Sequence, residues 1–148
     1  NLNAPSAFVL SRQGLEPLAK GEFGEVSNGA YLLSSAKDAK ITFIASGSEV
    51  SLCVKAAAIL AEQGIGANIV SAPCFDLLCE QPAEYVARIL DKNTTIIAVE
   101  AATGYEWYKF ADAVYGMNSF GASGKANELF DHFGFTPQKL ANFASELI

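Results

Sequence analysis

Residues 41–71 are the stretch that most constrains the fold of this 148-residue chain. They open with the apolar run ITFIA at residues 41–45, which is typical of a strand buried on both faces. Residues 50–63 follow, rich in alanine and leucine, and Gly64 is suited to end a helix. Residues 67–71 have the pattern of a second strand. This order predicts a right-handed strand–helix–strand crossover within a parallel sheet.

The turn between the first strand and the helix, Ser46 to Glu49, has the spacing of a capping box. Side chains three residues apart in this way can satisfy the first free amides of a helix. A helix start after a strand can also hold a phosphate on the same amides. The carboxylate of Glu49 opposes an anion at that place, so we expect capping.

The remaining elements alternate between strands and helices. The short polar connection at residues 34–40 favours an antiparallel pairing of strand 29–33 with strand 41–45. Thr136 and Pro137 have the residue types of a helix cap and a first helical position. We predict further strands at 7–10, 94–100 and 114–117, helices at 82–90, 105–110, 126–133 and 137–147, and loops at 14–28, 72–76 and 101–104. This alternation predicts a three-layer α/β/α domain whose five-stranded sheet is mostly parallel, with one antiparallel edge strand.

The loop at residues 14–28 predicts a domain boundary, because it holds Pro17, Gly21, Gly24 and charges without a clear period. A lone strand at 7–10 has no sheet of its own. We therefore expect residues 1–13 to end a preceding domain, 14–28 to be a linker and 29–148 to form the α/β domain. The chain begins at Asn1, so we expect a processed protein or a fragment of a longer one.

Charge and cysteine content exclude several classes of protein. The net charge is −6 and the basic residues form no stripe, so nucleic acid and anionic membranes are poor partners. No apolar run approaches the ~18 residues that cross a bilayer. Cys53, Cys74 and Cys79 have no histidine or further cysteine nearby. We expect free thiols in a reducing compartment and no zinc site.

Ligands of such sheets bind beyond the carboxyl ends of the strands, where three segments are predicted to lie: 46–49, 72–76 and 100–104. Glu100, at a strand end, has the chemistry of a general acid or base. The alternative is a structural carboxylate held by loop amides or a neighbouring helix start, and we favour it. His132 is the only histidine and lies near a helix end, so a surface role is expected.

Aromatic residues and glycines add no complete active site. Trp107, Tyr105 and Tyr108 are expected to fill space beneath a loop, with stacking on a ligand as the alternative. No glycine-rich pattern has the spacing of a dinucleotide fingerprint or a P-loop, and no HExxH, GxSxG or paired CxxC motif occurs.

Several stretches together resemble the C-terminal region of transketolase, in the order of that family and over nearly the whole chain. They are LSRQ (10–13), FIASGSEV (43–50), VSAP (70–73), AVEA (98–101), WYK (107–109), GM (116–117), FGAS (120–123) and FGFT (133–136). Gly124-Lys125 departs from the Ala-Pro that the family more often has. Residues 70–81 do not resemble the corresponding segment of other thiamine enzymes such as deoxyxylulose-phosphate synthase.

The resemblance implies a homodimeric, cytoplasmic transferase of the pentose phosphate pathway. It would move a two-carbon ketol unit between sugar phosphates with thiamine diphosphate and Mg2+ or Ca2+. The cofactor motif and the catalytic histidines of the family have no match in this chain, so the resemblance implies an inactive C-terminal fragment without cofactor, metal or catalytic residues. Arg12 matches the arginine that binds the sugar phosphate. The alternatives are a separate α/β module that binds a small anion or nucleotide at its strand ends, and a purely structural domain that supports a dimer.

Overall fold

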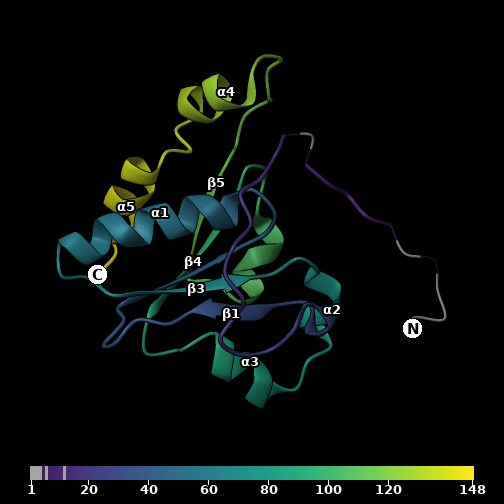
Figure 1. Ribbon diagram of the computed structural model, residues 1–148, viewed down its shortest axis with the longest axis vertical. Helices are drawn as coiled ribbons and strands as arrows, with labels where there is room; N and C mark the ends of the chain where they lie inside the picture. The colour runs from purple at the N-terminus through teal and green to yellow at the C-terminus, as the bar shows by residue number, and fades with distance from the viewer. Residues whose placement is uncertain (1–4, 6, 12) are drawn as a thin grey trace.

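The computed structural model describes residue 5, residues 7–11 and residues 13–148. A five-stranded sheet lies between two layers of helices (Figure 1). The strands are β1 (Tyr31–Ser34), β2 (Ile41–Ala45), β3 (Ala67–Ser71), β4 (Thr95–Glu100) and β5 (Ala113–Gly116). The helices are α1 (Glu49–Glu62), α2 (Phe75–Cys79), α3 (Ala83–Ile89), α4 (Ala126–His132) and α5 (Pro137–Ser145), with short 3-10 helices η1 (Val26–Asn28) and η2 (Tyr105–Lys109). Within the described residues, no helix is long and apolar enough to cross a membrane.

The strand order is β1-β3-β2-β4-β5, and only the β1–β3 pair is antiparallel. The predicted mostly parallel sheet with one antiparallel edge strand is therefore confirmed. The predicted neighbour of β1 is wrong, because β1 pairs with β3 and not with β2. Both sides of β2 are taken by β3 and β4, so the 34–40 connection passes the end of β3, where the Asn68 side chain accepts a hydrogen bond from the Ala36 amide at 3.0 Å.

The two faces of the sheet bury separate cores, as the alternation of side chains along a strand requires. Phe43 of β2 belongs to the core beneath α1 and α5, whereas its neighbour Ile44 belongs to the core beneath α2, α3 and η2. Figure 1 shows α1 above the strands and α3 below them. Both residues are fully buried, which confirms that 41–45 is a central strand covered on both faces.

A buried polar chain runs past the amino ends of three neighbouring strands, from Asn68 of β3 through Thr42 of β2 to Thr94, which directly precedes β4. The Thr94 hydroxyl donates to the Asp91 carbonyl at 2.7 Å, so the Thr42 hydroxyl must donate to Thr94, also at 2.7 Å. Thr42 in turn accepts from the Asn68 side-chain amide at 3.2 Å. Each group is satisfied, which permits these polar side chains to lie inside the sheet layer.

The N-terminal part of the chain leaves the domain at one end (Figure 1). Residues 7–10 form no strand, and Phe8, Val9 and Leu10 are 85, 96 and 81% exposed. The strand predicted at 7–10 is therefore wrong for this chain, because no strand in its described part pairs with these residues. The later linker residues do contact the domain: Phe23 forms a β-bridge with Leu32, and the Arg88 guanidinium lies 3.6 Å from the centre of the Phe23 ring.

Candidate functional site

Two glutamates lie beyond the carboxyl ends of the central strands. Glu49 is the first residue of α1, which follows β2, and Glu100 is the last residue of β4. The Ser46 hydroxyl after β2 donates to the Glu100 carboxylate at the end of β4, across 3.4 Å. The Ser48 hydroxyl donates to the Glu49 carboxylate at 3.1 Å. We call Glu49 and Glu100, with these two hydroxyl groups, the carboxyl pair.

The predicted capping box is wrong. The N-cap residue of α1 is Ser48, and its side chain caps no amide. Ser46 contributes only its carbonyl, which accepts from the Glu49 amide at 3.2 Å. Its hydroxyl is engaged by Glu100, a partner from another strand that no local spacing in the sequence reveals.

Glu49 is nearly inaccessible, with 5% of its surface exposed. Burial raises the pKa of its carboxyl group, and the charge of Glu100 raises it further. Hydrogen bonds from its own amide, from Ser48 and from the amide of Ala101 lower the pKa in part. The ionised form is therefore disfavoured but not abolished at this position.

Glu100 lies in a similar environment and is half-buried. Burial raises its pKa, hydrogen bonds from Trp107 and Ser46 lower it, and the charge of Glu106 raises it. The two carboxyl groups lie close enough for the charge of Glu100 to raise the pKa of Glu49. Glu100 is thus held by other groups of the protein, as the structural alternative predicted. The predicted partners are wrong, because the side chains of Ser46 and Trp107 take the place of loop amides or a helix start.

Trp107 was predicted to fill space beneath a loop, and it does so at 4% exposure. It also contributes a hydrogen bond to Glu100, which the sequence did not signal. Its ring packs edge-on against Phe75, with ring centres 5.2 Å apart. Tyr105 and Tyr108 behave differently from the prediction, since 75% and 57% of their surfaces are exposed.

The segment 72–76 is not a loop throughout, because α2 begins at Phe75. The Cys74 amide donates to the Gly29 carbonyl at 3.0 Å, which ties this segment to the start of β1. Asp76, its only acidic residue, is exposed. The segment therefore serves packing and adds no side chain to the carboxyl pair.

The other predicted site residues lie apart from the carboxyl pair. Arg12 lies outside the described residues, and its phosphate contact stays a prediction. His132 is exposed at the end of α4, as expected for a surface residue, and its ring packs edge-on against Phe133. The three cysteine thiols are free. Among the described residues, no group of three or more His, Cys, Asp or Glu side chains is placed to hold a metal.

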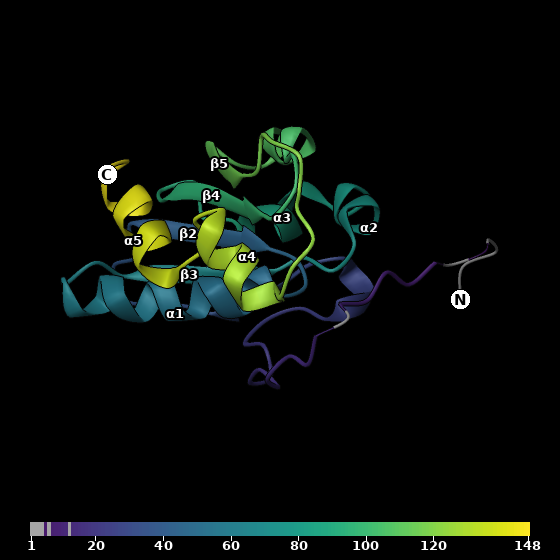
Figure 2. The ribbon, with the colours of Figure 1, turned by 90° about the horizontal axis from the view of Figure 1, so that it is seen from above.

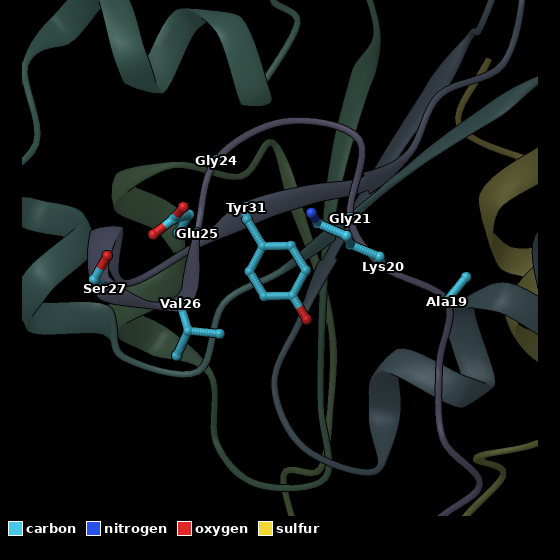
Figure 3. Close-up of a pocket in the computed structure, with 8 residues that line it drawn as sticks. All are labelled: Ala19, Lys20, Gly21, Gly24, Glu25, Val26, Ser27 and Tyr31. Atoms are coloured by element: carbon cyan, nitrogen blue, oxygen red, sulfur yellow. The ribbon is translucent and has the colours of Figure 1, made fainter.

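Two cavities lie apart from the carboxyl pair. One, of about 460 Å3, lies between the linker and β1, with the Tyr31 ring between Lys20 and Glu25 (Figure 3). The second, of about 160 Å3, is mainly apolar and begins at Ala101, directly after Glu100. The linker cavity is lined by Ala19, Lys20, Gly21, Gly24, Glu25, Val26, Ser27 and Tyr31. Neither cavity is lined by both members of the carboxyl pair.

The topology and the strand-end groups define a three-layer α/β/α domain built on strand–helix–strand crossovers. The family model for the transketolase-like C-terminal domain matches residues 29–136. The chain therefore belongs to the transketolase family, as a C-terminal domain of that family.

Individual relatives agree with this assignment. Transketolase 1 of Saccharomyces cerevisiae is 42% identical over 99% of this chain, which covers 22% of that protein. The crystal structure of transketolase from Campylobacter jejuni matches with a TM-score of 0.90 and 52% identity, over 95% of this chain and 22% of that one. A Pichia stipitis transketolase in complex with sedoheptulose-7-phosphate matches with a TM-score of 0.80 and 38% identity, over 86% and 19%. The chain thus spans about a fifth of the length of these relatives.

Proposed function

We propose that this chain is the C-terminal part of a transketolase that transfers a two-carbon ketol unit between sugar phosphates. The family match over residues 29–136 carries the proposal. The relative solved with sedoheptulose-7-phosphate supports the substrate class. On this proposal the complete protein is a cytoplasmic homodimer of the pentose phosphate pathway.

Thiamine diphosphate and a divalent metal ion, Mg2+ or Ca2+, belong to the proposed activity. The described residues do not fit the metal, since they include no cluster of three or more metal-ligating side chains. We therefore assign both groups to the parts of the complete protein outside this chain. The 148 residues alone would be inactive, with a structural or regulatory role.

Arg12 is the one residue of this chain that we assign to substrate binding. A guanidinium is planar and permanently charged, and it matches two phosphate oxygens at once. It would hold the phosphate end of the sugar, away from the reacting carbonyl. This role is inferred from the family resemblance of residues 10–13.

A second candidate function is a module that binds a small anion or nucleotide at the strand ends. The carboxyl pair weighs against it, because Glu49 and Glu100 place negative charge where the anion would lie. Their raised pKa values reduce this repulsion only when a proton is bound.

Two measurements test the main proposal. The complete protein, supplied with thiamine diphosphate and Mg2+, should convert a ketose phosphate and an aldose phosphate into the exchanged pair. The isolated chain should show neither this activity nor heat of binding in a calorimetric titration with thiamine diphosphate and Mg2+. Micromolar, magnesium-dependent binding to the isolated chain would overturn the placement of the cofactor.

A further inference from the structure

Three exposed aromatic rings cluster on η2 and on the loop between β5 and α4. Phe120 is 99% exposed, Tyr105 75% and Tyr108 57%. Between residues 29 and 145, the other exposed large apolar side chain is Val54, at 36%. Leu147 and Ile148 at the C-terminal end are also exposed, at 41 and 52%, but they are aliphatic. Tyr105, Tyr108 and Phe120 are the exposed aromatic side chains of residues 29–148, and we call them the aromatic surface.

The aromatic surface is hollowed and has a polar fringe. A cavity of about 90 Å3 is lined by Tyr105, Tyr108 and Asn118, among others. A second cavity, of about 340 Å3, shares Asn118 and is lined by Phe120. The other polar lining residues are Thr103 and Ser119, so the lining of both cavities carries no charged side chain. An aromatic centre with neutral polar groups is the composition of a protein–protein contact and not of an ion site.

The aromatic surface faces the side on which the N-terminal segment leaves the domain. It follows the carboxyl ends of β4 and β5, and both ribbon views show residues 7–11 extending away on that same side (Figures 1 and 2). That segment carries Phe8, Val9 and Leu10, each more than four-fifths exposed. Polypeptide that continues upstream of these residues would thus begin on the same side of the domain as the aromatic surface.

We propose that the aromatic surface docks against the polypeptide that precedes this chain in the complete protein, from its own subunit or a partner subunit. This inference rests on the proposed function in one respect, namely that the complete protein extends upstream like its relatives, of which this chain covers about 22%. Another copy of the same domain is a poorer occupant, because each copy carries a net charge of −6. Burying three rings at once would stabilise the contact, since aromatic residues dominate such interfaces.

Hydroxyl-radical footprinting with mass spectrometry tests the proposal without any substitution. In the complete protein, the oxidation rates of Tyr105, Tyr108 and Phe120 should fall several-fold below those in the isolated 148-residue chain. A labelling experiment in the complete protein provides an independent measurement that does not depend on folding of the isolated chain. Phe120→Cys should react slowly with a maleimide probe, while Ala58→Cys, at an exposed position of α1, should react at the rate of a free surface thiol.

The outcomes separate this proposal from the proposed function, because ketol transfer by the complete protein is measured in the same samples. Active protein with freely reactive rings would overturn the docking proposal and leave the function standing. Inactive protein with protected rings would support docking and count against the function. Dimerisation of the isolated chain that Phe120→Ser abolishes would identify a second copy as the occupant and overturn the proposal as stated.

Discussion

Substitution of Thr42 by valine should destabilise the domain through a single buried donor. Valine has nearly the shape of threonine, so the packing around this fully buried side chain is retained. The change removes two hydrogen bonds, to Thr94 at 2.7 Å and from Asn68 at 3.2 Å. Thr94 keeps its bond to the Asp91 carbonyl, whereas one hydrogen of the Asn68 amide loses its acceptor.

The expected cost follows from that unpaired donor. A buried polar group left without a partner costs about 1–3 kcal/mol, against a total stability of ~5–15 kcal/mol for an ordinary domain. Urea unfolding followed by the fluorescence of the buried Trp107 should show a lower midpoint with an unchanged slope. Thr95→Val, at the next and partly exposed position, is the matched control and should stay within ~0.5 kcal/mol of the parent. Equal effects of the two substitutions would refute the assignment of a continuous hydrogen-bonded chain.

Three further predictions concern the carboxyl pair, one glycine and Arg12. Because the folded-state pKa of Glu49 is raised, its contribution to stability is complete below the ordinary pKa of 4.5 and is lost as the pH rises through the raised value. Glu49→Gln should therefore flatten the pH dependence of the free energy of unfolding, measured in urea from pH 4 to 8. An unchanged pH profile would contradict this role of Glu49. Gly29→Ala should lower the free energy of unfolding by more than about 3 kcal/mol, because Gly29 has φ +82° and a Cβ there would meet the Leu78 amide nitrogen within contact distance. The control Gly64→Ala, at φ +77° with open space around it, should lower it by only ~1–2 kcal/mol. Similar losses of stability in thermal unfolding would show that the close approach at Gly29 is unimportant. Arg12→Ala in the complete enzyme should raise KM for phosphorylated sugars roughly 10- to 100-fold, since a charged hydrogen bond contributes about 1.5–3 kcal/mol. The KM for an unphosphorylated donor is the control and should stay the same. Equal increases in KM for both donors would show that Arg12 is structural.

Local signals in the sequence predicted most of the elements. Strands at 41–45 and 67–71 form with the predicted bounds, because continuous apolar runs between turn residues leave little choice of conformation. The last helix begins where Thr136 and Pro137 predict, and the Thr136 hydroxyl accepts from the Lys139 amide at 3.3 Å. These features depend on neighbours within a few residues.

The errors involve partners that are distant in the sequence. Strand β1 pairs with β3 because β2 has no free edge, and a short connection does not reveal which edges are free. Ser46 bonds to Glu100, 54 residues away, instead of capping α1. For the same reason the sequence marked Glu49 and Glu100 separately, but only the fold brings them to neighbouring strand ends.

The bridge between Phe23 and Leu32 has a consequence for how the domain can be shortened. Leu32 exchanges backbone hydrogen bonds with Phe23 at 2.9 and 3.3 Å, so linker residues cover the outer edge of β1. The family match begins only at residue 29. A truncation at that boundary would uncover the edge strand and remove the partner of Arg88, which favours aggregation by edge-to-edge pairing. A shortened version of the domain that begins near residue 20 would keep Phe23, and with it the cover on this edge of the sheet.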